Sequence, residues 1–299
     1  MKKANLWGDF MKLSTSTGVF SSRITEKQGI KILKDAGFDA YDFSLDIVKI
    51  HDYWLNCDDY REKAIEFRKY ADEIGIECNQ CHAPFPSSRG NEDDEKIFES
   101  IVKSMEIASI LGAKNIIVHP KQHLCYAEHA EELFNMNVEF YKRLLPFAKK
   151  FKIRIATENM WQYNDKSHSI TDSTCSRAWE FCKYIDAIDS EWFVACLDIG
   201  HISLVNADIP AFIKALGKKR LKALHIHDTD YVRDLHTLPF TQKIDYHAVI
   251  KALAEIDYDG DFTYEADGFY AKFPEELFPQ TAKFMCEVGR YLVLKFNEY

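Results

Sequence analysis

The chain has 299 residues, of which 46% are apolar and 28% charged, and 38 basic against 47 acidic residues give a formal net charge of −9. This composition is typical of a globular protein with a large core, and the acidic balance disfavours nucleic acid and anionic membranes as partners. No apolar run approaches the roughly 20 residues of a membrane-spanning helix, and the N-terminus reaches Asp9 before any signal-like apolar stretch. These features predict a soluble, cytoplasmic protein.

Helix-like and strand-like segments alternate along the chain. Short apolar runs that end in polar residues recur roughly every 30 to 40 residues, which is the spacing of βα units rather than of hairpins. The eight segments that contain a predicted strand are residues 10–14, 35–42, 72–82, 111–119, 151–158, 191–198, 220–227 and 259–265. Two apolar faces at helical spacing lie between them: Ala64, Phe67, Ala71 and Ile74, with Asp59 as N-cap, and Ile97, Ile101, Met105 and Ala108.

Eight strands that are each followed by a helix predict an α/β fold, a single (β/α)8 TIM barrel over residues 1–299. No linker or low-complexity segment divides the chain. The alternative is a doubly wound open sheet, but the sequence has neither a G-x-G-x-x-G motif after the first strand nor a P-loop.

The eight cysteines are too scattered for a disulfide framework in a chain of this length. Cys78 and Cys81 have the spacing of a redox or zinc motif, but they fall in the predicted strand at 76–82. Residues three apart on a regular strand point to opposite faces. We therefore interpret the cysteines as reduced and mostly buried.

The ends of the predicted strands are rich in metal-ligand side chains. In a (β/α)8 barrel these C-terminal ends form the catalytic mouth. The residues there and just beyond are His82, His119, Glu158, Asp198, His201, His225, His227, Asp228, Asp234, His236 and Glu265. A single such residue is more often structural, but carboxylates crowded at one mouth repel one another, and a divalent cation is the simplest remedy. The sequence therefore predicts a metal site.

These strand-end motifs resemble those of a known superfamily. The ordered set is Glu158-Asn159, Asp198-Ile-Gly-His201, His225-Ile-His-Asp228 and Glu265-Ala266. It resembles the xylose-isomerase-like barrels, which include sugar isomerases, sugar epimerases and endonuclease IV. The segment 234–246 further resembles sugar phosphate isomerase/epimerase members, although Phe240, Thr241 and Gln242 stand where that family often has glycines.

The resemblance implies that Glu158, Asp198, His225 and Glu265 bind one divalent metal. It favours His225 over His227 because the family's ligand on this strand lies three residues before an acidic or polar position, here Asp228. This mostly oxygen donor set suits Mn²⁺, with Mg²⁺, Co²⁺ or Zn²⁺ as alternatives.

The resemblance also implies that Glu158 and Glu265 exchange a proton next to a metal-polarised carbonyl, while His201 binds a hydroxyl or assists proton transfer. The residues expected to contact the substrate are His82, His119, Trp161, His227, Arg233 and His236.

The loops expected at the mouth contain many aromatic residues, namely Trp7, Phe85, Trp161, Tyr163, Tyr231, Phe240, Phe269 and Tyr270. They either pack on the rim or form a platform for sugar rings or an aryl group. No Gly-rich anion cradle follows the last two strands. Arg233, Lys121 and Lys272 are the candidate phosphate partners, but a solvated charge is the favoured interpretation of each. An unphosphorylated substrate is therefore expected.

The predicted function is a metal-dependent sugar isomerase or epimerase that acts on a small sugar or glycoside, with a homo-oligomer or an accessory subunit left open. One alternative is a lyase that cleaves keto-glycosides, including C-glycosides, after the same proton abstraction. The other is an endonuclease IV-like nuclease with three zinc ions, for which the matching donor types are present. The acidic and aromatic loop 228–231 lacks the basic rim that DNA requires.

Overall fold

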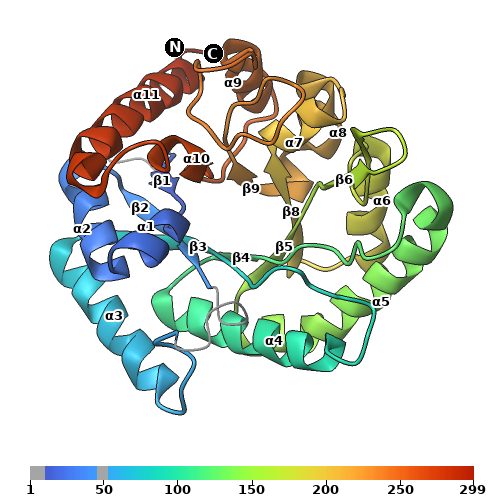
Figure 1. Ribbon diagram of the computed structural model, residues 1–299, viewed down its shortest axis with the longest axis horizontal. Helices are drawn as coiled ribbons and strands as arrows, with labels where there is room; N and C mark the ends of the chain where they lie inside the picture. The colour runs from blue at the N-terminus through green and yellow to red at the C-terminus, as the bar shows by residue number, and fades with distance from the viewer. Residues whose placement is uncertain (1–10, 46–52) are drawn as a thin grey trace.

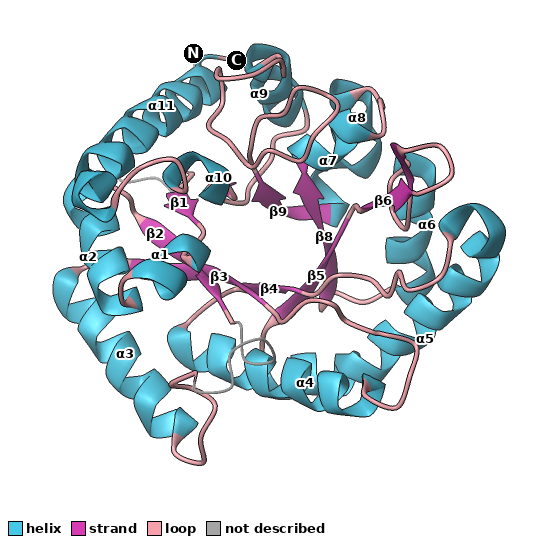
Figure 2. Ribbon diagram, in the orientation of Figure 1, coloured by secondary structure: helices cyan, strands magenta, loops and turns pink. Residues whose placement is uncertain are grey.

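The structure is a computed structural model that describes residues 11–45 and 53–299. Short parallel strands surround a central axis, and a ring of helices encloses them (Figures 1 and 2). The barrel strands are β1 (Leu13–Thr15), β2 (Ala40–Ser44), β3 (Glu77–His82), β4 (Asn115–Ile117), β5 (Arg154–Glu158), β8 (Phe193–Asp198), β9 (Leu221–His225) and β10 (Phe262–Tyr264).

Six of these strands pair in chain order from β2 to β9, and β1 pairs with β10. Isolated parallel bridges between Ser16 and Asp42 and between Ile226 and Tyr264 join the two sheets and close the barrel. The predicted α/β fold with eight barrel strands is therefore confirmed.

The outer ring consists of amphipathic helices that pack their apolar faces on the strands. They are α2 (Glu26–Ala36), α3 (Tyr60–Ile74), α4 (Asp94–Leu111), α5 (Tyr126–Phe151), α6 (Ala178–Ile188), α8 (Ile209–Arg220), α9 (Tyr246–Glu255) and α11 (Phe278–Glu298). Shorter helices are α1 (Gly18–Arg23), α7 (Ile199–Leu204), α10 (Asp267–Tyr270) and the 3-10 turn η1 (Glu275–Leu277). Within the described residues, no helix is long and apolar enough to cross a membrane.

Both predicted helical faces are present. Ala64, Phe67 and Ala71 are buried in α3, and the apolar face from Ile97 to Ala108 is buried in α4. Asp59 precedes α3 as predicted, but its side chain makes no capping hydrogen bond. It forms an ion pair with Lys63 at 3.3 Å instead.

Strand β3 is not the regular strand that the sequence analysis assumed. Its pairing with β2 skips Asn79, which is therefore the extra residue of a β-bulge. The bulge turns Cys78 and Cys81 toward each other, and their Sγ atoms lie 3.5 Å apart in the core. The prediction that these thiols point to opposite faces is wrong, whereas all eight cysteines are free thiols and five of them are buried, as expected.

The interior of the barrel is layered along its axis. Side chains alternate across a strand, so Arg154, Ala156 and Glu158 of β5 share the inward face. The middle layer is a separate buried cluster of small and branched apolar side chains, namely Ile117, Ala156, Val194, Cys196 and Ala223. This layer fills the barrel and separates its two ends.

An antiparallel hairpin that the sequence analysis did not predict follows β5. It consists of β6 (Trp161–Asn164) and β7 (Ser169–Asp172). The Gln162 amide anchors it by donating to the Gln122 and Leu124 carbonyls at 2.9 and 2.7 Å. The hairpin thereby places Trp161 at the barrel mouth, where its Nε1 donates to Asp234 Oδ2 at 3.2 Å.

Glu180 on α6 is a buried carboxyl that forms no ion pair with any of the described residues. Its side chain is 3% exposed and accepts the Cys175 N–H at 2.9 Å. Burial raises the pKa of Glu180 to about 7, although the Cys175 hydrogen bond opposes the shift. A Glu in the unfolded chain has a pKa of about 4.3. The contribution of Glu180 to the free energy of unfolding is therefore fully present below that pH and is lost as the pH rises through about 7.

Glu180→Gln is therefore expected to be about 1–2 kcal/mol more stable than the wild type at pH 8 and nearly equal to it at pH 4. Urea unfolding at both pH values measures the difference. Glu131→Gln, at an exposed position on α5, is the control and should show no gain. An unchanged pH dependence in Glu180→Gln would contradict this role.

Candidate active site

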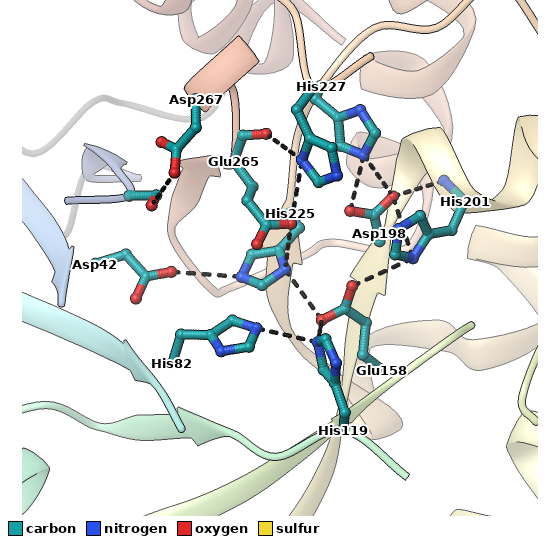
Figure 3. A network of polar contacts seen from close by, with 12 residues as sticks. Asp42, His82, His119, Glu158, Asp198, His201, His225, His227, Glu265 and Asp267 are labelled. Carbon is teal, nitrogen blue, oxygen red and sulfur yellow. Dashed lines mark hydrogen bonds and ion pairs between the residues drawn. The ribbon is translucent and has the colours of Figure 1, made fainter. Parts of the chain in front are cut away.

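The C-terminal ends of the strands bring the predicted histidines and carboxylates together at one mouth of the barrel (Figure 3). Glu158 ends β5, Asp198 ends β8, His225 ends β9 and Glu265 directly follows β10. Each offers a ligand atom, and these atoms all lie within 4.8 Å of one another. The four residues predicted to bind a metal thus form one group of donors.

Local backbone contacts fix the position of Asp198. Its Oδ1 accepts the His201 N–H at 2.6 Å and caps α7. The Asn159 side chain accepts the Asp198 N–H at 2.8 Å and donates to the Asp198 carbonyl at 2.9 Å. A Cβ atom at Gly200 would collide with the His227 ring, so α7 can approach β9 only with glycine at this position.

Two carboxylates approach the same ring nitrogen of His225. Its Nδ1 is 3.1 Å from Glu158 Oε2 and 3.2 Å from Glu265 Oε2. Three buried atoms nevertheless lack a hydrogen-bond partner of acceptable geometry among the described residues. They are both ring nitrogens of His225 and Oε1 of Glu158. Buried polar atoms rarely lack partners, and donors that converge without bonding one another fit a shared cation.

Both glutamates are ionised at neutral pH. Burial alone would raise the pKa of Glu158, but the His225 and His119 imidazoles outweigh it and hold that pKa well below its ordinary value. Burial is likewise outweighed at Glu265, where His225 and His236 lower the pKa. Both side chains can therefore accept a proton.

A second group of donors adjoins the first and consists of His201, His227, Asp234 and His236. Asp234 Oδ2 is 3.1 Å from His236 Nε2 and 3.4 Å from His201 Nε2. His227 Nε2 lies 3.0 Å from Asp198 Oδ1 and links the two groups. Burial opposes the charge on His236, but Asp234 and Glu265 raise its pKa to about 10.

A third group shares Glu158 with the first. His119 Nε2 is 3.1 Å from Glu158 Oε2, and His82 Nε2 is 3.0 Å from His119 Nε2. The Phe85 ring packs edge-on against His119 with centroids 4.9 Å apart. Four of the predicted substrate contacts, His82, His119, His227 and His236, are thus donors in the second and third groups.

The remaining predicted substrate contacts differ. Trp161 lies at the mouth, whereas the Arg233 side chain is 69% exposed and pairs with Asp230 at 2.7 Å. The structure therefore does not bring Arg233 into the donor groups. Tyr270 is also not on the rim, because it is fully buried against Phe20 with centroids 5.2 Å apart. Trp7 lies outside the described residues.

Sequence reasoning did not assign a role to two acids at the mouth. Asp42 on β2 accepts from the Gln80 amide at 2.8 Å and lies 3.4 Å from His225 Nε2. Asp267 accepts from Ser16 Oγ at 3.2 Å, and burial, followed by the charge of Glu265, raises its pKa to about 6. Asp42 ends a predicted strand segment like the other donors, so the same rule could have found it.

A barrel with acids and histidines at the C-terminal strand ends belongs to the class of TIM-barrel proteins that place their sites at this mouth. A family profile described as xylose isomerase-like TIM barrel matches residues 30–288, and the chain belongs to this family. The resemblance inferred from the strand-end motifs is thereby confirmed.

Two relatives illustrate the range of the family. The chain is 25% identical over 252 residues to a candidate L-ribulose-5-phosphate 3-epimerase, SgbU, of Escherichia coli K12. This match covers 81% of this chain and 84% of that protein. It is 27% identical over 180 residues to a candidate endonuclease 4 of Bacillus licheniformis. This match covers 56% of this chain and 57% of that protein.

Solved structures share the fold at low sequence identity. A D-tagatose 3-epimerase-like protein has a TM-score of 0.75 at 20% identity and covers 96% of this chain and 99% of its own. The IolI protein with a bound zinc atom has a TM-score of 0.68 at 16% identity and covers 96% and 98%.

Proposed function

We propose that this protein is a metal-dependent sugar isomerase or epimerase in which Glu158 and Glu265 exchange a proton at a carbon next to a carbonyl. The observation that carries the proposal is the pair of ionised carboxylates that both approach Nδ1 of His225, at 3.1 and 3.2 Å (Figure 3). Relatives named as 3-epimerases, among them SgbU and the D-tagatose 3-epimerase-like protein, support the sugar class.

Glu158, Asp198, His225 and Glu265 would hold one divalent cation. The fit rests on their converging donor atoms and on the unpartnered nitrogens of His225. Three carboxylates and one imidazole suit Mn²⁺ best, with Mg²⁺, Co²⁺ or Zn²⁺ as alternatives. When bound, the cation supplies polarisation of the substrate carbonyl and stabilisation of the negative charge that develops on its oxygen.

The protein's own groups would move the proton. If the substrate carbon lies between the two glutamates, one carboxylate removes its proton, and the other, after it takes a proton from solvent, delivers that proton to the opposite face and inverts the carbon. The first carboxyl then releases the abstracted proton to solvent. His201 Nδ1 is 2.8 Å from the Asn159 carbonyl and 3.3 Å from Glu158 Oε1. His201 therefore lies against Glu158, and its other nitrogen, Nε2, lies 3.4 Å from Asp234 Oδ2 and would bind a substrate hydroxyl beside that carboxylate.

The aromatic rings at the mouth would contact the sugar. Phe85 covers His119, and Trp161 packs edge-on toward His201 with centroids 6.4 Å apart. With His82, His227 and His236 around them, these side chains would orient the hydroxyl groups and exclude water from the reacting carbon. Arg233 would take part only if it left Asp230.

Solvent-deuterium exchange tests the proposal. The Mn²⁺-loaded protein is expected to incorporate deuterium from D2O at the carbon next to the carbonyl of its ketose substrate. NMR of a panel of ketopentoses, ketohexoses and their phosphates measures this incorporation and identifies the product. Exchange accompanied by loss of an aglycone would identify the lyase alternative, and the absence of exchange throughout the panel would reject the proton-transfer chemistry.

The nuclease remains a second candidate because of one observation. Ten acids and histidines form three adjoining groups, of which two share Glu158 and two are linked by the contact of His227 with Asp198, an arrangement that could hold three zinc ions. The acidic loop that carries Asp228 and Asp230, and the net charge of −9, disfavour DNA. Metal analysis by mass spectrometry separates the two: one Mn, Co or Mg per chain supports the sugar enzyme, and three zinc ions with cleavage of abasic DNA support the nuclease.

A further inference from the structure

A cavity of about 680 Å³ lies at the N-terminal end of the barrel, opposite the mouth. It forms where β4, β5, β8 and β9 begin and where α5, α6 and α8 end, and these elements are neighbours on one side of the barrel (Figure 1). The middle apolar layer separates it from the donor groups at the mouth. The cavity is therefore a distinct site.

Cationic side chains dominate the lining. The six cations are Lys114, Lys152, Arg154, Lys219, Arg220 and Lys222, against the three acids Asp186, Asp189 and Glu191. Two of the cations are already paired, Arg220 with Asp186 at 2.8 Å and Lys222 with Asp259 at 2.7 Å. The chain as a whole has a net charge of −9, so this excess of cations is local.

Arg154 distinguishes the cavity from an ordinary basic surface. It is the first residue of β5, and the strand's alternation turns it to the same inward face as Ala156 and Glu158. Within the described residues, its guanidinium has no hydrogen bond or ion pair, although it is only partly exposed; the carboxylates of Asp259 and Asp261 attract its charge only from a longer distance. A guanidinium presents five N–H donors in a planar fork, and partly buried donors without acceptors are costly.

Helix dipoles account for the positions of two of the cationic side chains in the lining but not for the position of Arg154. Lys152 follows the last turn of α5, and Lys219 lies in the last turn of α8, where cations interact favourably with the helix C-terminus. That interaction requires no ligand. Arg154 begins a strand inside the barrel, so no helix end stabilises its charge, and the nearby Asp259 that attracts it is already paired with Lys222.

We propose that this cavity binds a small polyvalent phosphate anion, with Arg154 as its forked ligand and Lys114, Lys152 and Lys219 as flanking cations. The planar fork of arginine matches two phosphate oxygens, and several uncommitted lysines favour a multiply charged ligand. A volume of about 680 Å³ accommodates an oligophosphate or a nucleotide. The site is independent of the sugar chemistry at the mouth.

Isothermal titration of the full-length, metal-loaded protein with sodium tripolyphosphate tests the proposal, with ATP and inorganic phosphate as comparators. We expect one site per chain, an affinity that falls with added salt, and a loss of about tenfold or more in Arg154→Gln. Tighter binding of ATP would identify a nucleotide site, and tighter binding of tripolyphosphate would identify an inorganic polyphosphate site. Both results support the anion site.

Matched variants keep the test decisive. Lys152→Gln and Lys219→Gln change exposed side chains, so they should fold normally and still weaken binding. Lys283→Gln changes an exposed lysine on α11 away from the cavity and should have no effect. No binding by the wild type at low salt, or equal affinity in the Arg154, Lys152, Lys219 and Lys283 variants, would overturn the proposal. The second result would place the anion elsewhere, for instance on the metal at the mouth.

Discussion

Replacing Glu158 or Glu265 with Gln is expected to lower epimerisation turnover by about 10² to 10⁴-fold, the usual contribution of a general acid or base. Glutamine keeps the size of the side chain and one oxygen donor, but it cannot accept a proton. The native carboxyls can, because their lowered pKa values keep them ionised at neutral pH. Three metal ligands remain in each variant, so the cation should stay bound at saturating concentration. Steady-state turnover, measured together with metal content, tests this result.

The two variants should also differ from each other. If each carboxylate serves one face of the substrate carbon, Glu158→Gln should still exchange the proton of one epimer with solvent, and Glu265→Gln that of the other. Glu180→Gln is the matched control, because it changes a buried carboxyl away from the mouth and should keep full turnover. Wild-type epimerisation by a metal-replete Gln variant at 158 or 265 would reject the two-base role.

The barrel and the position of its donors were predictable because both depend on short-range patterns. Regular spacing of apolar runs indicates βα units, and the C-terminal ends of parallel strands must meet at one mouth. The order of the strand ends therefore placed the acids and histidines at one mouth, and the family resemblance selected Glu158, Asp198, His225 and Glu265 among them.

Features that depend on tertiary pairing were not predictable. The bulge at Asn79 exists because β3 pairs with β2 out of register, and no local pattern around Cys78 indicates it. Aromatic and polar residues alternate over only four positions of β6, from Trp161 to Asn164, which is too short a pattern to distinguish a strand from a loop. The hairpin depends instead on the hydrogen bonds of the Gln162 side chain to distant carbonyls. Arg154 gave no signal either, because a charge at the start of a strand is usually solvated.

The position of the cation depends on which of two histidines binds it, His225 at the end of β9 or His227 just beyond that end. His225 Nδ1 lies 3.1 and 3.2 Å from two carboxylates, whereas His227 Nε2 contacts Asp198 at 3.0 Å and stacks on His236 with centroids 4.1 Å apart. We therefore interpret His225 as a ligand and His227 as the residue that orients Asp198. Removing an orienting partner of a ligand typically weakens metal binding by about 10 to 100-fold, and removing a ligand should cost more.

His225→Ala is accordingly expected to weaken Mn²⁺ binding by more than about 100-fold, and His227→Ala by about tenfold. Competitive titration against a chelator of known affinity measures both, and thermal melting shows whether each variant is folded. The reverse order would identify His227, two residues beyond the end of β9, as the ligand. If the protein instead holds three zinc ions, each variant should lose one ion and keep two, because His225 and His227 belong to different donor groups. The ratio of metal to protein after dialysis therefore separates a one-metal sugar enzyme with an orienting His227 from a three-metal centre in which both histidines are ligands.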